Sequence, residues 1–199
     1  MLRLILASAS LRRIELMRQV GLKFDIMPAD IDEASTGFDD AGKYAMEMSR
    51  QKALHIARKI EQSAYPDTFV LGADTVVSID SHLLGKPTDE ADAKRMLSLL
   101  ENRWHEVITG ITLVRTGSLE IMTDIEITRV KVSPFPKGFL EHYIATGEPY
   151  GKAGSYAIQG YGSLMVERIE GCYFNVMGLP LFKLSRMLER RGHKVLSWV

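Results

Sequence analysis

The sequence predicts a single α/β domain over residues 1–199, with a mixed twisted sheet, flanking helices and two lobes around a central cleft. Apolar runs typical of strands are interspersed with segments of helical periodicity. Two long strand-like runs in the middle of the chain are joined by a short turn, and this adds an antiparallel hairpin to strands that helices separate. No repeat, low-complexity tract or polar linker divides the chain into independent parts.

The first half of the chain predicts strands and helices in alternation. A compact apolar run at 2–7 is typical of a buried strand, and the apolar spacing over 11–20 predicts a helix that Gly21 ends. Alternation of apolar and charged residues predicts a second strand over 22–26. Further elements are a helix over 39–60, a strand over 68–80, a loop over 84–87 and a helix that begins at Thr88.

The second half predicts a hairpin followed by a glycine-rich segment. Strand-like runs over 107–114 and 119–132 form the hairpin, and a change in the phase of alternation near Thr128 and Arg129 predicts a bulge there. A helix over 138–145, a segment over 147–162 with five glycines in sixteen residues, a strand over 164–169 and a helix from Pro180 to about Arg191 follow.

Composition excludes several classes of protein. The chain has 25 basic and 25 acidic residues, so its charge does not favour a broad contact with nucleic acid or an anionic membrane. Its one cysteine, Cys172, excludes an internal disulfide and suits a reducing compartment. No apolar run approaches the roughly 20 residues that a membrane-spanning helix needs. We expect a cytoplasmic protein that binds neither nucleic acid nor membranes, with any anion site confined to a local cluster.

Two charged residues occupy positions where burial is predicted. Lys52 falls in the middle of the apolar face of the helix over 39–60, so it either extends its ammonium to water or lies beside an anion. Asp74 interrupts the apolar strand over 68–80, so it either caps a turn or binds a cation, a metal or several donors.

The stretch from Ser8 to Arg13 is the third unusual feature. Arginines at the start of a helix oppose its macrodipole by about 0.3–1 kcal/mol each, so Arg12 and Arg13 favour a compensating anion beside the hydroxyls of Ser8 and Ser10. The alternative is a serine N-cap followed by arginines that face solvent.

Together these residues suit a polyphosphate bridged by a divalent cation. Their spacing fits neither the GxxxxGK[ST] phosphate loop nor GxGxxG, and the serines lack the GxSxG context of a hydrolase nucleophile. The candidate cations are Arg12, Arg13, Lys52 and Lys86, and the candidate carboxylates are Glu33 and Asp74.

Four motifs in the chain are Ser8-Ala9-Ser10-Leu11-Arg12-Arg13, Gly72-Ala73-Asp74-Thr75, Gly85-Lys86-Pro87 and Lys152-Ala153-Gly154-Ser155-Tyr156-Ala157-Ile158-Gln159-Gly160. In this order they resemble the motifs of the Maf family of nucleoside triphosphate pyrophosphatases. The resemblance implies a fold like that of the inosine triphosphate pyrophosphatases (Maf/Ham1). It also implies a cytoplasmic homodimer that hydrolyses a nucleoside triphosphate to a monophosphate and pyrophosphate. The implied cofactor is a divalent cation, Mg²⁺ first, with Mn²⁺ or Co²⁺ as alternatives. Leu11 departs from the proline that is usual in the family.

The resemblance also implies roles for individual residues. Ser8, Arg13, Lys52 and Lys86 match phosphate-handling positions, Glu33 matches the acidic metal-site position and Asp74 matches the proton acceptor. Arg12, Thr75 and Gln159 match positions for base selection. We expect Asp74, Lys52 and Lys86 to be the catalytic residues, and Glu33 and Asp74 to hold the metal together. The glutamine at 159 resembles the residue found in the subgroup that acts on dTTP, UTP and modified pyrimidine nucleotides. Its amide offers both a hydrogen-bond donor and an acceptor, which can complement uracil or thymine. The alternatives are hydrolysis of 7-methyl-GTP or another purine triphosphate, and a nucleotide-binding regulator of septum formation without useful hydrolysis.

Overall fold

The computed structural model describes residues 3–31, 40–60 and 68–193 of the chain. Its strands are β1 (Arg3–Leu6), β2 (Asp25–Ile26), β3 (Thr68–Ile79), β4 (His82–Leu84), β5 (Trp104–Arg115), β6 (Ile121–Val132) and β7 (Val166–Glu170). These seven strands of the described part form one sheet in the order β2-β1-β3-β5-β6-β7, with β4 also paired to β3. Strand β1 runs parallel to β2 and β3, and the other neighbours are antiparallel. The predicted mixed sheet is therefore confirmed.

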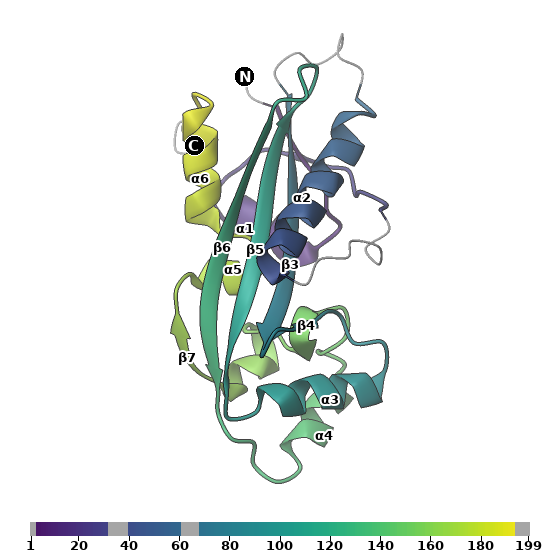
Figure 1. The fold of residues 1–199 in the computed structure, drawn as a ribbon, viewed down its shortest axis with the longest axis vertical. Coiled ribbons are helices and arrows are strands. Elements are labelled where there is room, and N and C mark those ends of the chain that lie inside the picture. The colour runs from purple at the N-terminus through teal and green to yellow at the C-terminus, as the bar shows by residue number, and fades with distance from the viewer. Residues whose placement is uncertain (1–2, 32–39, 61–67, 194–199) are drawn as a thin grey trace.

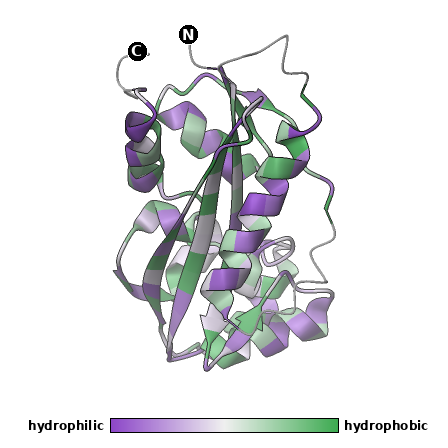
Figure 2. Cartoon of the chain, turned by 45° about the horizontal axis from the view of Figure 1, so that its top comes forward, coloured by the Kyte–Doolittle hydropathy of each residue, from purple (hydrophilic) through white to green (hydrophobic). Residues whose placement is uncertain are grey.

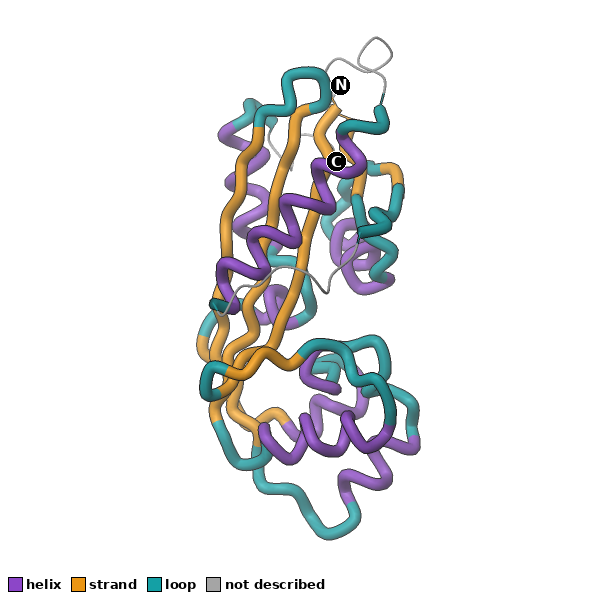
Figure 3. Tube along the Cα trace, turned by 45° about the vertical axis from the view of Figure 1, so that its right-hand side comes forward, coloured by secondary structure: helices purple, strands orange, loops and turns teal. Residues whose placement is uncertain are grey.

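Helices cover the sheet and group into two lobes (Figures 1 and 3). They are α1 (Leu11–Gln19), α2 (Ala41–Ala57), α3 (Glu90–Leu100), α4 (Phe139–Ala145), α5 (Tyr173–Val176) and α6 (Leu181–Arg190), with 3-10 turns η1 (Ala153–Ser155) and η2 (Gly160–Met165). One lobe holds α1, α2 and α6 around the long strands, and the other holds α3, α4 and β4 (Figure 1). None of the described helices is long and apolar enough to cross a membrane.

Side chains of β3 alternate between two helical layers. Val70 packs in a cluster with Ala53 and Ile56 of α2, whereas Phe69 and Leu71 belong to the main core together with residues of α1 and α6. Green and purple residues alternate along α2, as expected for a helix with one face against the sheet (Figure 2). Consecutive residues of β3 therefore face opposite layers, and this decides which elements each can contact.

Helix α2 lies directly against the backbone of the sheet at two glycines. A Cβ atom at Gly72 of β3 would lie 2.1 Å from the carbonyl oxygen of Ser49, and one at Gly110 of β5 would lie 2.2 Å from that of Ala45. No side chain fits in that space. The two glycines therefore set the distance between α2 and the middle of the sheet.

Replacing Gly72 by alanine is expected to lower the free energy of unfolding by about 3 kcal/mol, because the added methyl group forces α2 away from β3. Thermal unfolding should show a melting temperature lower by about 6–12 °C. Gly85→Ala is the matched control, since a Cβ there meets no atom within 4 Å. Equal melting temperatures for the two variants would contradict the close packing.

Most predicted elements are present, and the predicted hairpin is formed by β5 and β6. Their register is continuous from Trp104 opposite Lys131 to Val114 opposite Ile121, so the bulge predicted near Thr128 and Arg129 is wrong. The phase of the pattern changes because the covering layer changes. Ile125 packs beside residues of α2, whereas Val130 and Val132 lie in the main core. The irregularity in β6 occurs instead between Lys131 and Val132, in its pairing with β7.

Three further details differ from the prediction. The strand expected over 22–26 is reduced to Asp25–Ile26, because Leu22 turns back and its N–H bonds the carbonyl of Met17. The strand expected over 164–169 begins at Val166, since the two residues before it complete η2. The sequence did not predict the short elements β4 and α5.

Candidate active site

The middle of β3 forms an open edge of the sheet. On this side of the strand, pairing with β1 ends at Leu71 and pairing with β4 begins at Val77. Among the described strands, residues 72–76 pair only with β5 on the other side. Asp74 lies at the centre of this gap, where the edge of β3 has no paired strand among the described ones.

A cavity of about 850 Å³ opens at the gap. Its walls come from the start of α1, from β3, from the loop after β4 and from the segment before η2. All the predicted site residues that the structure describes line it, namely Ser8, Arg12, Arg13, Lys52, Asp74, Thr75, Lys86 and Gln159. The remaining predicted residue, Glu33, lies outside the described residues.

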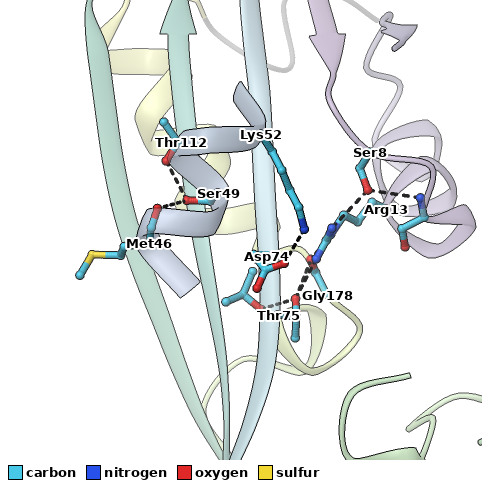
Figure 4. A network of polar contacts seen from close by, with 11 residues as sticks. Ser8, Arg13, Met46, Ser49, Lys52, Asp74, Thr75, Thr112 and Gly178 are labelled. Carbon is cyan, nitrogen blue, oxygen red and sulfur yellow. Dashed lines mark hydrogen bonds and ion pairs between the residues drawn. The ribbon is translucent and has the colours of Figure 1, made fainter. Parts of the chain in front are cut away.

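Asp74 and Lys52 form a buried ion pair in the wall of the cavity (Figure 4). Nζ of Lys52 donates to Oδ1 of Asp74 at 2.6 Å, and the two residues are 9% and 8% exposed. The first alternative for Lys52, an ammonium extended to water, is therefore wrong, and so is a turn-capping role for Asp74. Each charge compensates the other in a place where a lone charge would be costly.

The pair depends on the close approach of α2 to the sheet. Lys52 directly precedes Ala53, whose backbone nitrogen would lie 2.8 Å from a Cβ at Gly72, two residues before Asp74. Asp74 is an even-numbered residue of β3, so it faces the layer that contains α2. Residue spacing along the chain does not predict this contact, because Lys52 and Asp74 belong to separate elements, α2 and β3.

Arg13 connects three segments on the other side of the gap. Its Nε donates to the carbonyl of Gly178 at 2.9 Å, Nη1 to the hydroxyl of Ser8 at 3.2 Å and Nη2 to that of Thr75 at 3.0 Å. The residue is 8% exposed, so the alternative of a solvent-facing arginine is wrong here. Ser10 occupies the N-cap position of α1 without a side-chain capping bond.

Thr75 faces the layer opposite to that of Asp74, because the two residues are adjacent in one strand. Its hydroxyl accepts from Arg13, shares a hydrogen bond with the hydroxyl of Thr109 at 2.9 Å and donates to the carbonyl of Gly178 at 3.4 Å. These contacts place Thr75 beside the guanidinium of Arg13 (Figure 4). Its expected part in base selection stays a prediction.

The comparison with known families decides the identity of the chain. The model of the family described as "Maf-like protein" matches residues 3–191. The chain belongs to the Maf family. The resemblance read from the motifs is therefore confirmed.

Relatives of this Maf protein match it over nearly their full length. Each of the following is named dTTP/UTP pyrophosphatase. The protein of Caldicellulosiruptor saccharolyticus is 42% identical over 99% of this chain and 98% of its own. That of Acetivibrio thermocellus is 44% identical over 99% of each, and that of Koribacter versatilis 47% identical over 95% of this chain and 94% of its own.

Among solved structures, the Ham1 protein of Staphylococcus aureus matches 95% of this Maf chain and 99% of its own, with a TM-score of 0.49 and 11% identity. That likeness is too weak to carry a conclusion, so the fold of the Maf chain rests on its own sheet topology.

The Maf site contains a further cation that the sequence reasoning did not assign. Lys152 lines the cavity and donates to the carbonyl of Tyr150 at 3.2 Å. Burial lowers its pKa, the neighbouring charge of Arg12 lowers it further and Glu148 raises it. The signal in the sequence was the lysine that opens the Lys152-Ala153-Gly154 motif.

Arg12 and Lys86 complete the basic wall of the Maf cavity. Arg12 is half-buried and makes no hydrogen bond or ion pair to any described residue. Burial lowers the pKa of its guanidinium, and the charge of Glu148 acts in the opposite direction. Lys86 is exposed on the loop after β4. An anionic ligand in the cavity would therefore meet cations from both lobes.

Among the described residues of the site, Asp74 offers a carboxylate oxygen that could bind a divalent cation. Oδ1 accepts from Lys52, whereas Oδ2 accepts no hydrogen bond from a described residue and is available as a ligand. Groups of three or more histidine, cysteine or acidic side chains able to hold a metal are absent from the part of the chain that the structure describes. Mg²⁺ is commonly held by one or two carboxylates together with substrate phosphates and water, so one carboxylate is sufficient for this kind of site.

Proposed function

We propose that this Maf protein hydrolyses dTTP and UTP to the nucleoside monophosphate and pyrophosphate. The observation that carries the proposal is the convergence of the Asp74–Lys52 ion pair and the Arg13 guanidinium on one cavity between the lobes. The names of the full-length relatives support the choice of substrates. Modified pyrimidine nucleotides belong to the same proposed substrate class.

The basic wall supports the binding of a triphosphate. Arg12 and Lys152 lose hydration on burial, so an anion that replaces lost water gains more from them than from exposed cations. Lys86 approaches from the other lobe. Arg13 is held by Ser8, Thr75 and Gly178, and this keeps one planar cation in a fixed orientation toward the cavity.

In the proposed reaction, water attacks the α-phosphorus, and the bond from that phosphorus to the bridging oxygen of the β-phosphate breaks. The carboxylate of Asp74 accepts the proton that the water loses. The cations stabilise the negative charge that passes to the departing pyrophosphate. A divalent cation, proposed as Mg²⁺ with Mn²⁺ or Co²⁺ as alternatives and held by Asp74 and Glu33, supplies Lewis-acid stabilisation of the phosphate oxygens when it is bound.

A substrate panel tests the proposal. Purified protein is incubated with dTTP, UTP, CTP and 7-methyl-GTP, and the products are identified by chromatography together with a pyrophosphate assay. We expect monophosphate and pyrophosphate from dTTP and UTP, loss of turnover with EDTA and recovery with Mg²⁺. Preference for 7-methyl-GTP would favour the purine alternative, and tight nucleotide binding without products would favour the regulatory one. Light scattering of the same sample tests the proposed homodimer.

Gln159→Glu is expected to lower kcat/KM for dTTP and UTP by about tenfold or more, because a carboxylate loses the donor that faces a pyrimidine carbonyl. Gln159 lines the cavity and is exposed, so the melting temperature should remain near that of the wild type. Gln19→Glu, at an exposed position at the end of α1, is the matched control. Unchanged turnover of both pyrimidine nucleotides in Gln159→Glu would remove this residue from base selection.

A further inference from the structure

Glu148, just after α4, binds two segments of the chain through one carboxylate. Its Oε1 accepts from the hydroxyl of Tyr143 at 2.9 Å and from the backbone nitrogen of Gly162 at 2.8 Å. Its Oε2 accepts from the backbone nitrogen of Tyr161 at 2.9 Å. Hydrogen bonds to a charged acceptor are stronger than neutral ones, so this is a firm attachment of the segment that follows Gln159.

The first turn of η2 needs such an acceptor. The initial N–H groups of a helical turn have no partner within the turn, and the side chain at the N-cap position commonly supplies one. Gln159 occupies the N-cap position of η2 with extended backbone and makes no side-chain capping bond. Glu148, from a different part of the chain, accepts hydrogen bonds from the N–H groups of Tyr161 and Gly162 instead.

This arrangement leaves the amide of Gln159 available to the cavity. The side chain of Gln159 makes no hydrogen bond to a described residue, and it lines the cavity. The residues before it are also held, because the backbone nitrogen of Ala157 donates to the hydroxyl of Tyr143 at 3.2 Å. Tyr143 and Glu148 thus fix the backbone on both sides of Gln159.

The backbone around Gln159 is shaped to admit the carboxylate. Gly160 has a φ of +83°, and a Cβ there would lie 2.2 Å from Oε2 of Glu148. A side chain at that position would therefore displace Glu148 as well as strain the backbone. A carboxylate beside a triphosphate would normally weaken phosphate binding, whereas the charge of Glu148 is engaged by three donors that belong to the protein.

We propose that Glu148 is a positioning residue for base selection. Glu148 accepts hydrogen bonds from the N–H groups at the start of η2 and from the hydroxyl of Tyr143. These bonds fix the backbone on both sides of Gln159, so that the amide of Gln159 reaches the pyrimidine. The inference rests on the proposed hydrolysis of dTTP and UTP, since selection among bases has meaning only for an enzyme that turns them over.

Glu148→Gln tests the role directly. An amide that replaces the carboxylate presents its own N–H groups to the backbone donors, so at least one attachment is lost. We expect kcat/KM for dTTP to fall by about 10- to 100-fold, mainly through KM, and the preference for dTTP over CTP to fall with it. Glu167→Gln is the control, at an exposed glutamate on β7, and should leave both quantities unchanged. A folded Glu148→Gln protein with undiminished preference would overturn the role of Glu148.

A double-mutant cycle distinguishes positioning from an independent contribution. Gln159→Ala should remove the preference for dTTP over CTP, and adding Glu148→Gln should cause little further loss of preference, because both changes act through one side chain. Losses of preference that multiply would overturn the inference. If Glu148→Gln does not fold, Tyr143→Phe is the second variant. It removes the hydroxyl that donates to Glu148 and accepts from Ala157, and it should reduce the preference more mildly.

Hydrogen exchange gives a readout that does not depend on turnover. The amide protons of Tyr161 and Gly162 should exchange about tenfold faster or more in Glu148→Gln, and those of the Glu167→Gln control should not. Equal exchange rates would overturn the inference. Absence of dTTP and UTP turnover in the wild-type protein would overturn the proposed function itself, whereas normal wild-type turnover with a selective Glu148→Gln variant overturns the role of Glu148 alone.

Discussion

Asp74→Asn is expected to lower kcat for dTTP hydrolysis by about 10³-fold, because an amide neither accepts a proton from water nor binds a divalent cation well. The measurement is steady-state pyrophosphate release at saturating substrate. The variant should remain folded with a lower melting temperature, since asparagine has the same shape and its carbonyl can still accept from Lys52, but the ammonium loses its counter-ion. Asp80→Asn is the matched control, because Asp80 is an exposed partner of Arg103 away from the cavity.

The same substitution separates chemistry from stability when it is combined with Lys52→Met. Asp74→Asn alone leaves a buried ammonium without its counter-ion, and breaking a buried pair costs about 3–5 kcal/mol. The double variant no longer buries an unpaired charge, so it should regain part of the melting temperature and none of the turnover. Near wild-type hydrolysis by either variant would contradict a role for Asp74 in the reaction.

Arg13→Lys is expected to lower kcat/KM for dTTP by about 100-fold, because an ammonium cannot reach acceptors on three segments at once. The guanidinium bonds Ser8, Thr75 and the carbonyl of Gly178, and a lysine would leave at least one buried acceptor without a donor. Chemical denaturation should show a loss of about 3 kcal/mol in the free energy of unfolding.

Arg18→Lys on the same helix is the control for Arg13→Lys. Arg18 is exposed in the last turn of α1, so the equivalent change there should leave both turnover and stability within error of the wild type. If Arg13→Lys retained full activity with reduced stability, Arg13 would hold the start of α1 in place without contributing to phosphate binding.

The secondary structure was largely predictable because it depends on periodicities within short windows. The apolar face of α2 and the hairpin of β5 and β6 follow from local spacing and turn residues. Helix α3 begins at Glu90 with Asp89 as its N-cap, close to the start expected at Thr88. The bulge expected near Thr128 failed for a physical reason. A change of phase in a strand indicates either an extra residue or a change in the layer that covers it, and a local pattern does not distinguish them.

The start of the strand expected over 164–169 was wrong for a related reason, although residues 166–169 are in β7. The first two residues of the expected strand complete η2, and the N–H groups in the first turn of η2 donate to Glu148 from another segment. A partner distant in sequence thus overrode the local preference for a strand.

The amino-acid sequence alone establishes the residue types of the site and the family. Costly charges at Lys52 and Asp74, two arginines at the start of α1 and the ordered motifs were visible without coordinates. How these charges are paired depends on the fold. Alternation along β3 sends Asp74 toward α2 and Thr75 toward Arg13, and the glycine contact at Gly72 sets how near Lys52 approaches. Such pairing depends on distances between elements, and residue spacing along a chain carries no information about the layer that will cover each face.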